Sequence, residues 1–288
     1  MTTATTGTAA TPAPGHTLTQ KYYRRFTPVE RVLHSALMLT FVGCALSGLP
    51  LLFSAKPWAA TLAEILGGYR GAGLIHRICA FVMIVVFSTH VLMVFGRAFK
   101  NGNVMKVLWG PDSMVPQWPD LVAIFQNFKW FVGKGPRPQF DRWTYWEKFD
   151  YWAVFWGMFI IGGSGLLLWF PVFFSKLLPG WMFNIAALVH GEEALLAVGF
   201  IFTIHFFNGH LRPEKFPMDT VVFTGRISEH ELKDERLVQF ERMQKEGSLA
   251  STETTPPTPE AKWFGWVVGG TALALGILAI VLILSSVL

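Results

Sequence analysis

Residues 73–98 read GLIHRICAFVMIVVFSTHVLMVFGRA, an apolar stretch that carries two histidines, His76 and His90. A second apolar stretch carries His190 and His205. An α-helix rises ~1.5 Å and turns ~100° per residue, so a spacing of 14 residues rotates a side chain by about −40° over ~21 Å, and a spacing of 15 by about +60° over ~22 Å. Each pair therefore lies on one face of its helix, with one histidine toward each end.

Two such helices running in the same direction bring the four histidines together at two depths. His76 then meets His190 near one membrane surface, and His90 meets His205 near the other. Ionisable side chains inside a bilayer are costly and mark functional sites, and imidazole is a common axial ligand of haem iron. The pattern predicts a four-helix bundle that holds two stacked bis-histidine haems. The alternative is that each histidine only bonds a neighbouring helix.

The composition is typical of an integral membrane protein. Of the 288 residues, 52% are hydrophobic, and there are 26 phenylalanines and 12 tryptophans. Five apolar stretches reach the ~20 residues that a helix needs to cross a hydrocarbon core of ~30 Å. We predict an all-α membrane protein with a four-helix haem-binding bundle and a fifth, C-terminal transmembrane helix. The expected spans are about 32–53, 73–98, 150–172, 186–208 and 264–287.

The loop charges predict the orientation. The N-terminal arm, residues 97–149 and residues 209–262 are rich in Lys and Arg, whereas 54–72 and 174–185 carry few. By the positive-inside rule, the N-terminus is cytoplasmic and the C-terminus lies outside a bacterial-type inner (plasma) membrane. The net charge of +5 then follows from topology and calls for no nucleic acid.

Outside the bundle we expect less regular structure. The predicted divisions are a disordered tail at 1–20, the haem-binding membrane domain at 21–211, a cytoplasmic segment at 212–262 and the fifth helix at 263–288. Within them, residues 121–131 have the pattern of a short interfacial helix.

Two further segments invite specific expectations. Residues 228–246 alternate charges as a solvated amphipathic helix does. The fifth span carries no charged residue, so it is expected to be a packing element, against the bundle or against a partner subunit. Small residues allow close helix contact, and the candidates are Gly265, Gly269 and Gly270.

Cys44 and Cys79 are the two cysteines, and both fall inside predicted spans. The chain has no Cys-x-x-Cys-His motif. Covalent c-type haem, an iron–sulfur cluster and a disulfide scaffold are therefore excluded. Any haem held by this chain must be noncovalent haem b.

A fifth histidine competes at the cytoplasmic depth. His34 in the first span lies about as deep as His90 and His205, so three imidazoles face an ordinary two-ligand site. Periodicity favours His90 with His205, because each shares a helix face with a histidine at the opposite surface.

Four motifs carry a family resemblance: RFTPVERVLH at 25–34, LSGLP at 46–50, His76-Arg77 and LVH at 188–190. The chain resembles the membrane cytochrome b subunits of formate dehydrogenases and their relatives that serve thiosulfate reductase and nickel–iron hydrogenase. This resemblance covers the first four spans. It implies that His34 and His205 hold the inner haem, with His90 left over.

The chain is also similar to cytochrome b subunits that partner multihaem c-type cytochromes, through Trp146-Glu147 and HGEEA at 190–194. The spacings of 14 and 15 are similar to the cytochrome b of bc-type complexes, which favours His90 with His205. The unused histidine is then expected to bond a haem propionate, to line a quinone site, or to bind a third haem with His210.

A quinone such as menaquinone is the expected substrate, because transmembrane haems need a mobile electron carrier at one end. Quinone chemistry needs a proton-accepting group near a haem edge. Glu192 and Glu193 beside His190 are candidates at the outer face, unless they only complement the dipole at a helix start. The rival set at the inner face is Glu30, Arg31, Glu147 and Asp150, where the formate dehydrogenase resemblance implies quinone reduction. The direction of electron flow stays open.

The sequence thus predicts an electron-transfer subunit of a larger respiratory complex, inactive alone. It would pass electrons between the quinone pool and an extracytoplasmic partner that carries c haems, iron–sulfur and molybdenum centres, or a hydrogenase site. Lys176 and Trp181 in the outer loops are the predicted docking region.

Two other classes remain as alternatives. A metal or proton transporter would use the intramembrane histidines together with carboxylates deep in the spans, and the spans have almost none. A non-redox membrane anchor would carry no chromophore. A self-contained haem ferric reductase is disfavoured because the cytoplasmic loops contain no flavin or nucleotide motif.

Overall fold

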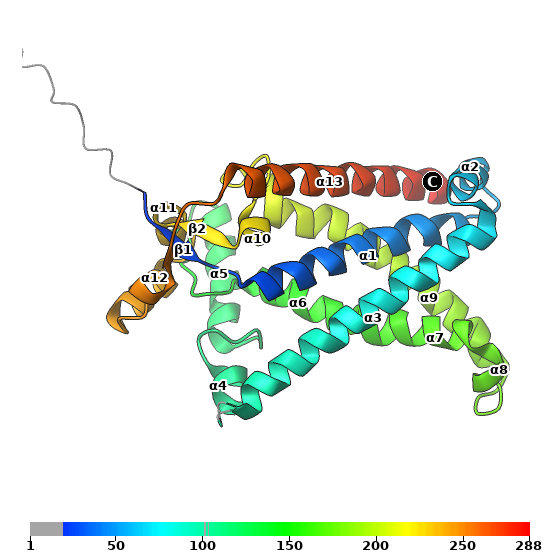
Figure 1. Ribbon diagram of the computed structural model, residues 1–288, viewed down its shortest axis with the longest axis horizontal. Helices are drawn as coiled ribbons and strands as arrows, with labels where there is room; N and C mark the ends of the chain where they lie inside the picture. The colour runs from blue at the N-terminus through cyan, green and yellow to red at the C-terminus, as the bar shows by residue number, and fades with distance from the viewer. Residues whose placement is uncertain (1–19, 101, 103) are drawn as a thin grey trace, which may run out of the picture.

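The computed structural model describes residues 20–288 apart from 101 and 103 (Figure 1). Five helices in this range are long and apolar enough to cross a membrane. They are α1 (Pro28–Leu52), α3 (Gly68–Lys100), Tyr145–Trp169, Trp181–Leu211 and α13 (Pro259–Val287). The predicted all-α membrane fold is therefore confirmed. The tail predicted at 1–20 lies outside the described residues except for its last position.

Two of the spans are built from several helical segments. The third consists of α6 (Tyr145–Gly157), the π-helix η1 (Met158–Gly162) and α7 (Gly163–Trp169). The fourth consists of α9 (Trp181–Phe200) and the π-helices η2 (Ile201–His205) and η3 (Phe207–Leu211). The third span ends earlier than predicted, because the residue before a proline disfavours helical geometry and Pro171 starts the separate helix α8 (Pro171–Phe174).

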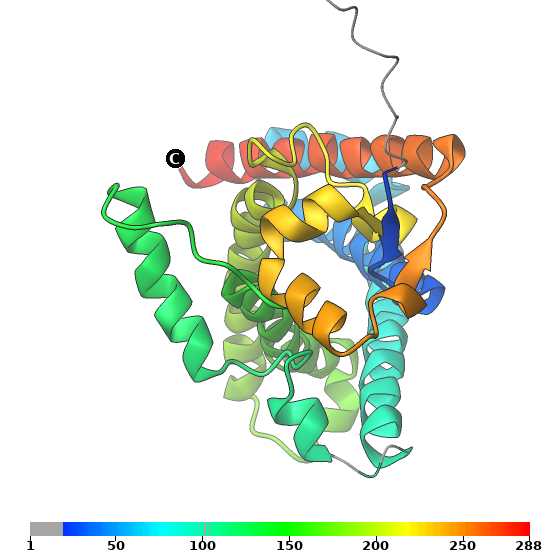
Figure 2. The same cartoon turned by 90° about the vertical axis from the view of Figure 1, so that its left-hand side faces the viewer.

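One end of the bundle is covered by a folded cap, which we define as residues 20–25 and 212–258 (Figure 2). Its antiparallel sheet has the order β2-β1-β3, with β1 (Tyr22–Arg24) between β2 (Arg226–Ser228) and β3 (Glu253–Thr254). The helices are α10 (Val221–Thr224), α11 (Glu229–Glu235), α12 (Leu237–Lys245) and the 3₁₀ turn η4 (Ala250–Thr252). We call this the cap end and the opposite end the far end.

The cap differs from the prediction of one amphipathic helix at 228–246. The backbone leaves helical geometry at Arg236, with φ −136° and ψ 43°, so two short helices form instead. Tyr23, Ile227, Leu232 and Phe240 pack together as a small hydrophobic core. The sequence pattern missed this unit because its strands are only two or three residues long.

The remaining helices lie at the two ends. At the cap end, the loop between α3 and α6 contains α4 (Val104–Trp109) and α5 (Trp118–Phe131), which agrees with the helix expected at 121–131. At the far end, α2 (Pro57–Ile65) lies beside the C-terminus of α13, and Trp58 donates a hydrogen bond of 3.1 Å to Ser286 (Figure 1).

The fifth span packs on its own chain. Phe202 of η2 lies against Gly276 of α13, where an added Cβ would come within 2.0 Å of the phenyl ring. Gly265 and Gly269 likewise face Phe223 and Met218. The small residues of α13 therefore serve contacts within this subunit, while Gly270 has open space beside it.

Candidate functional site

His76 of α3 and His190 of α9 face each other at the far end of the bundle. Their ring centroids are 6.0 Å apart and their planes are inclined by 78°. His76 Nδ1 lies 3.1 Å from the carbonyl oxygen of Cys44, and His190 Nδ1 lies 2.9 Å from that of Ile161. A carbonyl only accepts, so each Nδ1 carries the proton and each Nε2 is left as a potential ligand.

The spacing of these rings fits a bound metal ion between them. Two metal–nitrogen bonds of about 2 Å each, together with the half-widths of the two rings, amount to about 6 Å between centroids. Glycine accompanies each ring: a Cβ on Gly48 would lie 3.2 Å from His76 Cε1, and one on Gly165 would lie 2.9 Å from His190 Cε1. The far end therefore places two imidazoles, each with a glycine beside it, at a separation that suits a bis-histidine metal site.

At the cap end, His34 lies near His205 and His210. The imidazoles of His34, His205 and His210 are close enough to interact electrostatically. His205 Nδ1 lies 2.9 Å from Asp150 Oδ2, a carboxylate–histidine contact of the kind that orients metal ligands. The Nδ1 atom of His34 is buried without a hydrogen-bond partner among the described residues.

His90 has a different neighbour. Its Nε2 atom is 3.0 Å from the hydroxyl of Tyr151, and the two rings are 5.6 Å apart. Its electrostatic partners are Arg97 and Glu30. Sequence periodicity favours His90 as the mate of His205, whereas His205 contacts Asp150 and interacts electrostatically with His34 and His210.

The two halves of the bundle are internal repeats. Residues 26–53 and 143–170 align with a constant offset of 117 positions. The matched pairs are Thr27 with Thr144, Glu30 with Glu147, Ser47 with Ser164 and Gly48 with Gly165. In both halves the Thr and Glu form a capping box that starts the helix. Histidine spacing alone missed this repeat, although the shared Thr-x-x-Glu and Ser-Gly-Leu motifs are visible in the sequence.

The repeat relates the pair His34 and His205 to the pair Tyr151 and His90. At the offset of 117, Tyr151 stands where the first half has His34; the second helices align at smaller offsets, 114 for His76 with His190 and 115 for His90 with His205. The π-helix Ile201–His205 accommodates the one extra residue of the longer spacing. At this depth the first half thus has two imidazoles, His34 and His90, while the second half has the phenol of Tyr151 and the imidazole of His205.

A single cavity of about 2520 Å³ connects both histidine groups. Ordinary ligand pockets measure roughly 300–1,000 Å³, so this one has room for several large groups. All six of the histidines described above line it: His34, His76, His90, His190, His205 and His210.

The two candidate outer carboxylates lie deeper than predicted. Because α9 already begins at Trp181, Glu192 and Glu193 are about three turns inside the helix, where the dipole of the helix start no longer acts. Glu193 lines the cavity and accepts a hydrogen bond of 3.1 Å from Trp156, whereas Glu192 is exposed.

The rival carboxylates at the cap end already have partners. Glu30 and Glu147 close their capping boxes, and Glu30 also lies 3.3 Å from Arg97. Arg31 donates to the carbonyl of Phe223 at 2.6 Å. Asp150 is the group in direct contact with a candidate haem ligand.

Comparison with known proteins identifies the family. Residues 25–211 match the model of the prokaryotic cytochrome b561 family. The chain is also similar to the formate dehydrogenase cytochrome b556(fdo) subunits of Escherichia coli strains K12, O6:H1 and O157:H7. It is 25% identical to each over 150 residues, which are 52% of this chain and 61% of each relative. The chain thus belongs to the prokaryotic cytochrome b561 family, multi-pass membrane proteins that transfer electrons through b-type haem.

Proposed function

We propose that this protein carries electrons across the membrane through two b haems, as the cytochrome subunit of a larger redox enzyme. The observation that carries the proposal is the facing pair His76 and His190, in which each Nδ1 is bonded to a backbone carbonyl so that Nε2 remains as the potential ligand, with a glycine beside each ring. Bound haem supplies one-electron chemistry, and the protein supplies the ligands and their orientation.

For the cap-end haem we propose His34 and His205 as ligands. The electrostatic interaction of His34 with His205 supports this pairing, as does the Asp150 carboxylate that would fix the orientation of the His205 ring. The resemblance to formate dehydrogenase subunits points the same way. His90, bonded to Tyr151, is then free of haem iron.

The electron donor and acceptor are proposed from chemistry and from relatives. A quinone such as menaquinone would exchange protons with Asp150, which contacts His205, or with Glu193, which lines the cavity three residues after His190. The relatives are subunits of formate dehydrogenase by name, which supports a catalytic redox subunit as the partner. We retain a cytoplasmic N-terminus, so the partner would dock outside, near Lys176 and Trp181.

The test is a reduced-minus-oxidised spectrum with haem quantification on the purified protein and on His34→Ala and His90→Ala. We expect two b haems in the native protein, loss of one in His34→Ala and retention of both in His90→Ala. Absence of a b-type spectrum would refute the proposal. Loss of a haem only in His90→Ala would instead assign His90 and His205 as the pair.

A further inference from the structure

Two arginines are buried at the cap end of the cavity. Arg25 and Arg236 are each only 6% exposed, and both line the cavity. Buried arginines are rare unless they are paired. Arg236 donates from Nη2 to Glu147 at 2.8 Å, but its Nη1 atom is buried and has no hydrogen-bond partner among the described residues. One edge of this guanidinium therefore lacks an acceptor.

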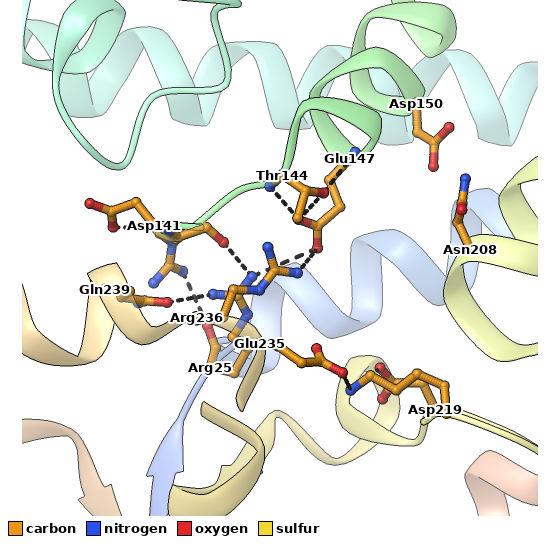
Figure 3. Close-up of polar contacts among 12 residues, drawn as sticks. Arg25, Asp141, Thr144, Glu147, Asp150, Asn208, Asp219, Glu235, Arg236 and Gln239 are labelled. Atoms are coloured by element: carbon orange, nitrogen blue, oxygen red, sulfur yellow. Dashed lines mark hydrogen bonds and ion pairs between the residues drawn. The ribbon is translucent and has the colours of Figure 1, made fainter. Parts of the chain in front are cut away.

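Among the described residues, the two arginines share one close carboxylate, while Asp219 acts on Arg25 from farther away. Figure 3 shows Arg25 and Arg236 converging on Glu147, which lies 3.8 Å and 2.8 Å from them. Arg142 adds a third cation, and Arg25 donates to its backbone carbonyl at 2.6 Å. Burial, and then the charge of Arg236, lower the pKa of Arg25 to about 9 despite Glu147. Buried charges are stable when they are paired, so an additional carboxylate would relieve this cluster.

The cluster lies beside the cap-end histidines. Glu147 is three residues before Asp150 on α6, a rise of about 4.5 Å, and Asp150 contacts His205. Figure 3 shows Asp150 next to Glu147 on the side away from the cap. The unpaired edge of Arg236 and the His34–His205 pair therefore line the same end of one cavity.

Arg236 comes from outside the residues that match the family model, which end at 211. It reaches the bundle because the cap folds back: Arg25 bonds Gln239, 214 residues later in the chain, at 3.0 Å. The break between α11 and α12 occurs at Arg236 itself, and it directs the side chain toward Glu147. The cap is thus more than a linker to α13, since it contributes a cation to the cavity.

We propose that Arg236, assisted by Arg25, binds a propionate carboxylate of the cap-end haem. The cap would thereby complete a haem site whose iron ligands come from the bundle. A guanidinium binds a carboxylate through two parallel hydrogen bonds, which suits the free edge of Arg236. This inference rests on the proposed two-haem function and adds a specific binding residue to it.

The test is a redox titration of both haems in the native protein and in Arg236→Gln. A nearby cation favours the reduced, less positive haem, so its loss should lower the midpoint potential of one haem and leave the other unchanged. His34→Ala, which keeps only the far-end haem, identifies the affected one. The propionate pKa should rise without its cation, so the affected potential should become more dependent on pH near neutrality.

Two variants separate this role from cap folding. Arg236→Lys keeps the charge but loses the forked geometry, and we expect a smaller downward shift. Arg242→Gln is the matched control: Arg242 ties the cap to Asp141 at 2.7 Å and to Asp112 at 2.8 Å but does not line the cavity. We expect native potentials in Arg242→Gln.

Unchanged potentials in Arg236→Gln, or an equal shift in Arg242→Gln, would overturn the propionate assignment. Failure of the proposed function is distinguishable, because the native protein would then lack two b haems before any arginine is changed. If Arg236→Gln does not assemble, Arg236→Lys decides: native potentials at every pH would also overturn the assignment.

Discussion

At the scale of single residues, the far-end site depends on two glycines as much as on two histidines. Gly48 and Gly165 occupy matching positions of the two repeats, and each lies against the Cε1 atom of the histidine that the other helix of its half presents. A side chain at either position would push the ring away from its backbone acceptor. The glycines therefore leave each ring the room to stay beside its backbone acceptor.

Substitution of Gly165 tests this role. A Cβ there would lie 2.9 Å from His190 Cε1, closer than side chains tolerate, so Gly165→Val should remove the far-end haem and Gly165→Ala should weaken its binding. Haem quantification and the reduced-minus-oxidised spectrum measure how much far-end haem each variant retains. Gly163→Val is the control, since a Cβ at Gly163 meets nothing within 4 Å. Equal haem loss at both positions would mean that the helix, rather than the ring, had been disturbed.

At the scale of elements, Lys215 holds the cap together. Its Nζ atom lies 3.0 Å from Asp219 and 3.1 Å from Glu235, and it also bonds Glu231. Burial alone would lower the pKa of Lys215, but the three carboxylates outweigh it and raise the pKa. Arg212 lies 3.8 Å from Glu235 as a second cation, and burial raises the pKa of Glu231 despite its contact with Lys215.

Lys215→Met should therefore open the cap. The variant would remove the cation that Asp219 and Glu231 contact and leave Glu235 with Arg212 at 3.8 Å, and breaking a buried pair typically costs about 3–5 kcal/mol. We expect faster proteolysis and faster hydrogen exchange in residues 212–258, with the bundle still protected. Lys233→Met removes an exposed ion pair with Glu229, for which about 0.5 kcal/mol is typical, and should have little effect. Similar exchange rates in the two variants would contradict the role given to Lys215.

At the scale of the whole molecule, contacts distant in sequence close both ends of the bundle. The N-terminal strand β1 lies between strands from the C-terminal half, and Trp58 bonds Ser286 at the far end. Tyr23 of β1 is 5% exposed and donates to Glu229 at 3.2 Å. Burial and the neighbouring carboxylate raise the pKa of Tyr23 from 10.0 to about 12.

This shift predicts that the cap loosens in alkali. Because the folded protein holds the Tyr23 proton more tightly than the unfolded chain does, the stabilisation is complete below about pH 10 and is lost as the pH rises toward 12. Tyr23→Phe lacks the ionisable group, so its cap should persist to higher pH, although it loses a hydrogen bond of about 1 kcal/mol at neutral pH. The measurement is the hydrogen-exchange rate of the cap as a function of pH, in the native protein and in Tyr23→Phe. Identical pH profiles would exclude Tyr23 as the group responsible.

The sequence by itself determined the membrane class, the approximate positions of the five spans and the b-type nature of any haem. These properties depend on local composition, because a helix satisfies its own backbone hydrogen bonds and needs only enough apolar residues to cross the bilayer. The prediction that His76 would meet His190 likewise required nothing beyond helical periodicity and the direction of two helices.

Only the tertiary structure decided which side chains meet at the cap end. His34 and His90 lie at similar depths, so spacing could not distinguish them. Helix packing places Tyr151 against His90 and His205 near His34. The cap was equally hidden, because strands of two or three residues leave no periodic signal. Arg25 and Gln239 meet across 214 positions of sequence, and a contact of that range arises only when the whole chain has folded.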